Sequence, residues 1–136
     1  MMGDGYSHWT LPRLAGLSNA ADILLTGRTF DGHEAQRLGV CSRALPGDQV
    51  LPAAMELARD VAEHAAPLSV AVSKRLLWES WDRSADQVET SETEAHHFLM
   101  ARADAREGVE SFLEHRPPRW TGSVAGELPL RSDSRP

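Results

Sequence analysis

The chain has 136 residues, of which 41% are apolar and 25% are charged, and its formal net charge is −6. This length can form one domain with a real core, and the composition is ordinary for a soluble globular protein. The acidic balance argues against non-specific nucleic-acid binding, which needs a basic patch. Cys41 is the single cysteine, which excludes an internal disulfide and favours a reducing, cytoplasmic setting. Residues 1–25 show no signal-peptide pattern, and the apolar runs are too short to span a membrane.

The first half of the chain predicts two short helices and a strand. Ser18–Gly27 carries an apolar cluster that ends in a glycine suited to a left-handed helix stop. Asp31 and Glu34 have the spacing of a capping box, which predicts a helix through Leu38. Residues 40–45 then form a short strand candidate, closed by a Pro-Gly pair.

The second half predicts longer helices. Apolar residues recur at helical spacing over Val50–Ala65, and a second stripe follows Pro67, a residue suited to the first helical turn, to about Asp82. Ser84 and Gln87 indicate another capped helix. Residues 123–136 are polar, with prolines near both ends of the last stretch, and are predicted to be disordered.

The stretch from Asp104 to Gly122 has the most distinctive pattern. Asp104 and Glu107 have the spacing of a reciprocal helix N-cap, and Pro117 with the proline after it should stop the helix. Gly108 lies inside this helix, where glycine costs up to about 1 kcal/mol against alanine. We therefore expect another backbone or a ligand to approach closely at this glycine.

This stretch, Asp-x-x-Glu-Gly-x-x-x-Phe-x-x-x-Arg-x-Pro-x-aromatic-x-Gly, resembles the C-terminal signature of the enoyl-CoA hydratase/isomerase (crotonase) superfamily. Leu-Pro-Arg-Leu-x-Gly at 11–16, Leu-Leu-Thr-Gly at 24–27 and the Glu-Ala segment at 34–40 resemble further family segments in the same order. The resemblance spans about residues 3–122. It implies a mostly α structure, the C-terminal helical part of a crotonase-like α/β fold, with at most one or two short strands.

The domain organisation expected from this resemblance has three parts. Residues 1–16 would be a truncated active-site loop region, residues 17–122 the crotonase-like helical region, and residues 123–136 the disordered tail. The glycine-rich segment that forms the family's oxyanion hole, and the two glutamates that activate water in its hydratases, would lie upstream of Met1.

The resemblance also implies a reaction: hydration of an enoyl-CoA thioester, or movement of its double bond, through a stabilised enolate. Backbone N–H donors stabilise the charge on the thioester oxygen, and a carboxylate moves the proton. Coenzyme A is part of the substrate, so no separate cofactor is expected. A metal site at Glu94 and His97 is not expected, because such sites repeat the Glu-His pair on a second helix and add two more carboxylates.

Asp4 is the candidate catalytic residue. Its segment, Asp-Gly-Tyr-Ser, resembles the one that carries the acid/base carboxylate of family isomerases and dehalogenases, although Gly3 replaces the usual proline and Tyr6 a usual glycine. A catalytic role would require burial that raises proton affinity towards neutrality. The alternative is that Asp4 is a turn residue that bonds its own backbone.

Three residues are candidates for contact with coenzyme A. Phe112 and His115 match positions that in the family contact the adenine end, often on a neighbouring subunit, and His115 replaces the usual lysine. Lys74 could approach the nucleotide phosphates as a point charge. The alternatives are core packing for Phe112, a solvated helix position for His115, and for Lys74 a stem lying along an apolar face.

Two functions remain open on the sequence. The chain could derive from an acyl-CoA-processing enzyme that works as a trimer-based homo-oligomer. Alternatively it could be a catalytically incomplete part that acts as an oligomerisation or acyl-CoA-contacting module, with an N-terminal part supplied elsewhere. In both cases the expected ligand is an acyl-CoA thioester, with no nucleic-acid or membrane partner.

Overall fold

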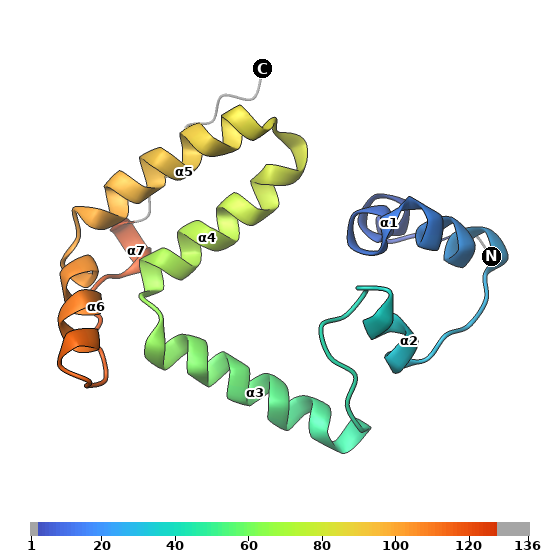
Figure 1. Ribbon diagram of the computed structural model, residues 1–136, viewed down its shortest axis with the longest axis horizontal. Coiled ribbons are helices and arrows are strands. Elements are labelled where there is room, and N and C mark those ends of the chain that lie inside the picture. Colours follow the sequence, from blue (N-terminus) through green and yellow to red (C-terminus); the bar gives the residue numbers. More distant parts are fainter. Residues whose placement is uncertain (1–2, 128–136) are drawn as a thin grey trace. The chain divides into compact units, whose positions relative to one another are not determined.

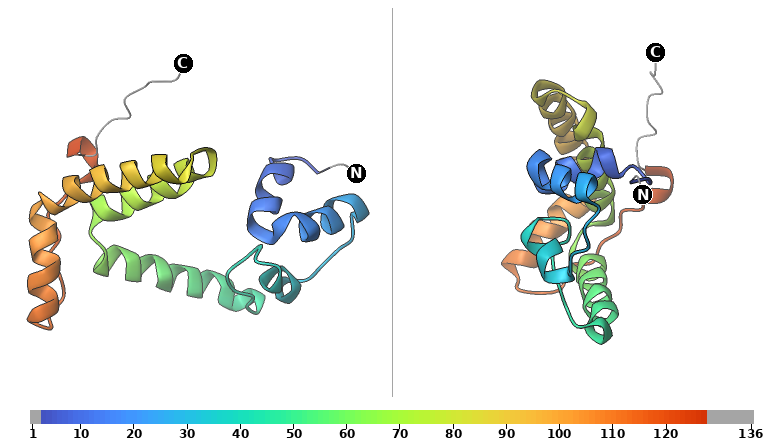
Figure 2. Two further views of the ribbon diagram at one scale, coloured as in Figure 1. Left: turned by 45° about the horizontal axis from the view of Figure 1, so that its top comes forward. Right: turned by 90° about the vertical axis from the view of Figure 1, so that its right-hand side faces the viewer.

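The computed structural model describes residues 3–127, which form helices joined by turns and loops and contain no strand (Figures 1 and 2). This confirms the mostly α fold class. The helices, in chain order, are α1 (Ser7–Thr26), α2 (Gly32–Arg37), α3 (Gly47–His64), α4 (Pro67–Glu79), the 3-10 turn η1 (Ser80–Asp82), α5 (Ala85–Met100), α6 (Ala103–Leu113) and α7 (Val124–Glu127). The described part of the chain contains no helix with the length and apolar content needed to cross a membrane.

Two compact units divide the chain, with the boundary between Ala54 and Met55, inside α3. The first unit holds α1, α2 and the start of α3. The second holds the end of α3 and all later helices. Each unit is described by itself.

In the first unit, α1 is longer than the sequence indicated. Gly16 has φ 77° and ψ 157°, so the helix is interrupted there, and the predicted helix at Ser18–Gly27 corresponds to its second half. Residues 7–16, expected to belong to an active-site loop region, are mostly helical. Gly27 ends α1 in the left-handed conformation, as predicted, and donates its N–H to Ile23 O at 3.0 Å. Ala20 and Ile23 are the buried apolar residues of this unit.

The predicted strand at residues 40–45 is wrong, because this segment has no strand conformation. The side chain of Gln36 satisfies part of its backbone instead: the amide nitrogen donates to Ser42 O at 3.4 Å, and the amide oxygen accepts from Ala44 N at 3.3 Å. The capping box before it is half formed. Asp31 accepts from Glu34 N at 2.8 Å, whereas the Glu34 carboxylate pairs with Arg28 at 2.9 Å.

In the second unit, α4 and α5 lie side by side and antiparallel (Figure 1). Leu68 and Val72 of α4 and Ala95 of α5 are its buried apolar residues. The capping box at Ser84 and Gln87 is confirmed: Gln87 N donates to Ser84 Oγ at 3.3 Å, and Ser84 N donates to Gln87 Oε1 at 2.9 Å. Helix α6 contacts α5, and α7 contacts α4.

Within the segment predicted to be disordered, Val124–Glu127 forms the short helix α7. The rest of the predicted disordered segment, residues 128–136, lies outside the described residues.

Candidate functional site

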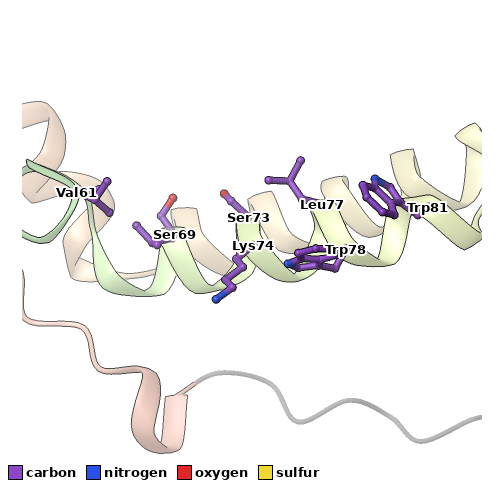
Figure 3. Close-up of a pocket in the computed structure, with 9 residues that line it drawn as sticks. Val61, Ser69, Ser73, Lys74, Leu77, Trp78 and Trp81 are labelled. Carbon is purple, nitrogen blue, oxygen red and sulfur yellow. The ribbon is translucent and has the colours of Figure 1, made fainter. Parts of the chain in front are cut away.

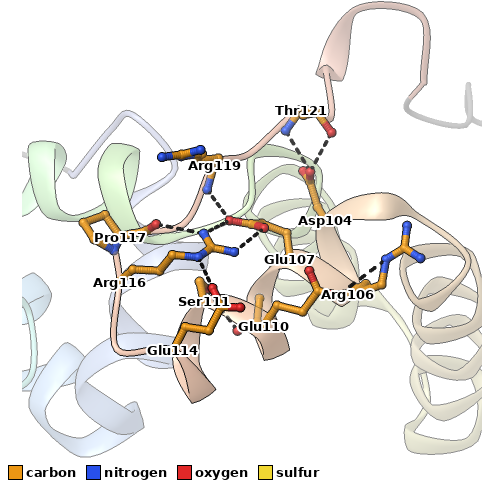
Figure 4. A network of polar contacts seen from close by, with 11 residues as sticks. Asp104, Arg106, Glu107, Glu110, Ser111, Glu114, Arg116, Pro117, Arg119 and Thr121 are labelled. Carbon is orange, nitrogen blue, oxygen red and sulfur yellow. Dashed lines mark hydrogen bonds and ion pairs between the residues drawn. The ribbon is translucent and has the colours of Figure 1, made fainter.

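A buried carboxylate ties the end of the chain to α6. Asp104 is only 6% exposed, and its Oδ1 accepts from Thr121 N at 2.8 Å and from Thr121 Oγ1 at 3.1 Å (Figure 4). Gly122 N donates to the same carboxylate, at 3.2 Å from Oδ1 and 3.1 Å from Oδ2. The predicted N-cap role of Asp104 is therefore wrong. The N-cap of α6 is Arg102, which makes no side-chain capping bond.

Glu107 also binds the segment that follows α6. Its carboxylate accepts hydrogen bonds from both terminal nitrogens of the Arg116 guanidinium, at 2.6 and 3.0 Å, and from the backbone N–H of Arg119 at 2.6 Å (Figure 4). The charged hydrogen bonds from Arg116, followed by the one from Arg119, lower the pKa of Glu107 from 4.5 to about 2. Glu107 and Glu114, in turn, raise the pKa of the Arg116 guanidinium.

We call Asp104, Glu107 and the donors in residues 116–122 the carboxylate clamp. Its two acids are one turn apart on α6, and their partners come 9 to 18 residues later. The clamp therefore fixes the segment that leaves the helix. The Asp-x-x-Glu part of the sequence motif therefore has a structural role in holding this segment.

Two glycines of the motif lie where this segment meets the helices, and only Gly122 requires the absence of a side chain. A Cβ added at Gly122 would be 2.7 Å from Asp104 Oδ2 and 3.1 Å from Leu68 Cδ1, so a side chain there would disrupt the clamp. A Cβ at Gly108 would lie 3.6 Å from the Trp120 ring, an ordinary contact. The close approach of a backbone or a ligand that we expected at Gly108 is therefore wrong for the described residues, because the Trp120 ring leaves room for a Cβ there.

Phe112 and His115 lie where the clamp turns the chain. Phe112 is 77% exposed, so the alternative of core packing within the described residues is excluded for it. His115 is exposed and has φ 52°, a left-handed conformation beyond the end of α6. Its N–H donates to Phe112 O at 3.3 Å, so the two residues form one exposed corner.

Lys74 lies elsewhere, on α4, and is exposed. It lines an open groove of about 680 Å³ together with residues from the end of α3 and the linker after it, from α4 and from η1 (Figure 3): Val61, Ala65, Ser69, Val70, Ser73, Leu77, Trp78 and Trp81. Neither Phe112 nor His115 lines this groove. The structure therefore brings together two of the three candidate coenzyme A contacts and keeps Lys74 on a mostly apolar surface.

Asp4 belongs to the first unit and is exposed in the turn that precedes α1. Its carbonyl accepts from Ser7 N at 3.0 Å, and Gly5 and Tyr6 both adopt the left-handed conformation, with φ of 58° and 63°. Tyr6 therefore adopts, with a bulky side chain, a backbone conformation that favours glycine. Within residues 3–127, no three His, Cys, Asp or Glu side chains are grouped so that they could hold a metal ion.

The partners of the two acids were not among the residues predicted from the sequence to bind them. Thr121 and Gly122 for Asp104, and Arg116 and Arg119 for Glu107, all lie in the quoted motif. The signal available was the presence of these acids, arginines and a glycine in one motif. The spacing of Asp104 and Glu107 predicted a local helix cap, whereas both acids bind residues beyond the end of the helix.

Comparisons with known proteins agree with this geometry. The enoyl-CoA hydratase/isomerase family model matches residues 1–123. The enoyl-CoA hydratase ACTT3 of Alternaria alternata is 33% identical over 125 residues, covering 91% of this chain and 42% of the relative. The mevalonyl-coenzyme A hydratase sidH of Aspergillus fumigatus is 33% identical over 119 residues, covering 84% of this chain and 44% of the relative.

A solved structure gives the same result at the level of the fold. The crystal structure of a probable enoyl-CoA hydratase/isomerase from Mycobacterium abscessus is 45% identical, with a TM-score of 0.87, and the match covers 90% of this chain and 48% of that one. The chain spans less than half the length of each of these relatives.

Proposed function

The chain belongs to the enoyl-CoA hydratase/isomerase family, and on this premise we propose that it is the C-terminal helical part of an acyl-CoA-processing enzyme. The reaction is addition of water to an enoyl thioester, or migration of its double bond, through an enolate. The observation that carries the proposal is the family match over residues 1–123, supported by 45% identity to a solved relative at a TM-score of 0.87.

Asp4 is the proposed acid/base in this chemistry. A carboxylate that moves a proton at carbon near neutral pH needs a desolvated setting. Asp4 is exposed in this chain, so the covering surface and the oxyanion donors have to come from the other half of the fold. The chain by itself is then a catalytically incomplete module, which is the second function we carry forward.

Phe112 and His115 are the proposed contacts for the nucleotide end of coenzyme A. An exposed aromatic ring can stack on adenine, and the adjacent imidazole can donate to a phosphate. The carboxylate clamp supports this role because it holds the corner that carries both residues. Lys74 is the weaker candidate, since it lines a separate groove. The proposed assembly is a homo-oligomer based on a trimer, in the cytoplasm.

Crotonyl-CoA turnover tests the chemistry. We would combine the purified chain with the portion of the Mycobacterium abscessus relative that it does not match, and follow loss of the conjugated-thioester absorbance. The proposal expects turnover that falls by at least about 100-fold in Asp4→Asn, the usual scale for general acid–base groups. Full activity of Asp4→Asn would remove Asp4 from the mechanism. Absence of turnover in a formed complex would leave the non-catalytic function.

A further inference from the structure

The carboxylate clamp holds Arg119 by its backbone alone. The N–H of Arg119 donates to Glu107 Oε1 at 2.6 Å, while the residue itself is exposed. In Figure 4 its side chain extends away from the carboxylate that its backbone binds. Within residues 3–127 the Arg119 guanidinium forms no hydrogen bond or ion pair. Since a guanidinium stays protonated at any ordinary pH, Arg119 presents a permanent positive charge at the surface.

Arg116, the other arginine of this segment, has its charge engaged. Its two terminal nitrogens bind the Glu107 carboxylate at 2.6 and 3.0 Å, and its Nε binds Glu114. These bonds use the planar fork of donors with which an arginine would grip a phosphate. Arg116 is therefore a structural cation, whereas Arg119 is available to a ligand.

The link between the two arginines is short and stiff. Residues 117 and 118 are both proline, whose rings fix the backbone φ angle. Glu107 binds the chain on both sides of this pair, through the Arg116 guanidinium and through the Arg119 N–H. The base of the Arg119 side chain is thus held in place relative to the exposed corner that precedes it. Little backbone entropy remains to be lost there when a ligand binds.

The exposed corner needs such a charge. Phe112 and His115 offer an aromatic ring and an imidazole, but His115 stands where the family usually has a lysine, so the corner has no permanent cation of its own. The nucleotide end of coenzyme A carries phosphate groups. We propose that Arg119 is a further coenzyme A contact, whose guanidinium binds one of these phosphates and supplies the positive charge that the corner lacks. The inference rests on the proposed nucleotide contact at this corner, and it does not depend on turnover.

The test is calorimetric titration of the full chain with coenzyme A at low salt. Arg119→Gln should weaken binding about fivefold, the scale of an exposed charge pair, and the difference should shrink as salt is raised. Arg119→Lys keeps the charge and should stay within about twofold of the unaltered chain. Because the clamp uses only the backbone N–H of Arg119, the melting temperature of Arg119→Gln should be unchanged. A lower one would show that the side chain serves the fold.

Two shortened ligands locate the contact. Pantetheine lacks the nucleotide, so Arg119→Gln should bind it as the unaltered chain does. Dephospho-coenzyme A lacks only the 3′-phosphate. A loss in Arg119→Gln that is seen with coenzyme A but not with the dephospho form assigns Arg119 to the 3′-phosphate, and an equal loss with both assigns it to the pyrophosphate. An equal loss with pantetheine would overturn the proposal.

A rescue variant and a matched control complete the design. His115→Lys, introduced into Arg119→Gln, should restore most of the lost affinity, because it returns a permanent charge to the same corner. Arg106→Gln is the control. Arg106 lies in the first half of α6, away from the corner at the end of this helix, and its side chain is 77% exposed. Arg106→Gln should bind like the unaltered chain, and a loss equal to that of Arg119→Gln would show a general charge effect and overturn the assignment.

The outcomes separate this inference from the proposed function. Affinity that falls in Phe112→Ala but not in Arg119→Gln would refute the role of Arg119 and leave the corner as the nucleotide contact. A chain that binds coenzyme A no better than pantetheine would refute both. Binding that depends on Arg119, in a protein that never turns over crotonyl-CoA, would refute only the proposed reaction.

Discussion

Thr121 donates both its backbone N–H and its side-chain hydroxyl to a single oxygen of Asp104, at 2.8 and 3.1 Å, across 17 positions of sequence. This pairing joins the segment after α6 to the start of that helix. It also explains why an acid occupies the buried second position of α6, where a side chain that caps the helix would not be needed.

Removing the Asp104 carboxylate should destabilise the chain. Asp104→Ala would leave Thr121 N, Thr121 Oγ1 and Gly122 N without their acceptor in a partly buried site, at a cost of about 2–4 kcal/mol. Asp104→Asn keeps one acceptor oxygen and should lose less than half of that. Urea denaturation followed by circular dichroism measures both variants, and equal stability of Asp104→Ala and the unaltered chain would show that the clamp contributes nothing.

The two glycines of the motif should respond oppositely to alanine. Gly122→Ala places a Cβ 2.7 Å from Asp104 Oδ2 and should destabilise by about 1–3 kcal/mol. Gly108→Ala meets Trp120 at an ordinary 3.6 Å, so the higher helix propensity of alanine should stabilise by up to about 1 kcal/mol. Thermal melts of the two variants provide the comparison. A stabilising Gly122→Ala would contradict the described contact.

Structural features that depend on neighbouring residues were predicted correctly from the sequence. The Ser84 and Gln87 capping box and the left-handed stop at Gly27 depend on residues within four positions of each other, and both are present in the structure. Asp104 and Glu107 have the same spacing of three residues, but they do not form the capping box that this spacing predicts. Capping partners are local, whereas these acids take partners 9 to 18 residues away, and spacing within one helix turn carries no information about them.

The sequence identified the candidate residues of the site, but not how they are arranged in space. The motif resemblance placed Phe112 and His115 near one another, and the structure shows them on one exposed corner. The separation of Lys74 from that corner depends on how α4 packs, which no local pattern encodes. The strand expected at residues 40–45 failed for a related reason. Its backbone is partly satisfied by the Gln36 side chain, and the described residues contain no partner strand.

Acid should weaken the clamp over a defined range. Because the pKa of Glu107 is lowered from 4.5 to about 2, its contribution to the free energy of unfolding is complete above pH 4.5 and is lost as the pH falls towards 2. Glu107→Gln should be less stable than the unaltered chain at pH 7, and the gap should close between pH 4.5 and 2. Urea titrations at intervals across this range measure the gap, and a constant gap would contradict the pKa assignment.

Restoring a permanent positive charge at the α6 corner should strengthen contact with the nucleotide phosphates. His115→Lys is expected to tighten coenzyme A binding up to about fivefold, equivalent to ~1 kcal/mol for an exposed charge pair. His97→Lys, at an exposed position on α5, adds the same charge elsewhere and is the control. Calorimetric titration with coenzyme A separates the two. Equal affinities for both variants would remove His115 from the proposed contact.

We propose that this chain supplies the helical part of a thioester enzyme whose oxyanion donors lie in the other half of the fold. The most direct test measures crotonyl-CoA turnover by the purified chain alone and after titration with the unmatched portion of the Mycobacterium abscessus relative. We expect no turnover above the uncatalysed rate for the chain alone, and turnover that rises to saturation at one-to-one stoichiometry. Substantial turnover by the chain alone, lost in Asp4→Asn, would contradict it.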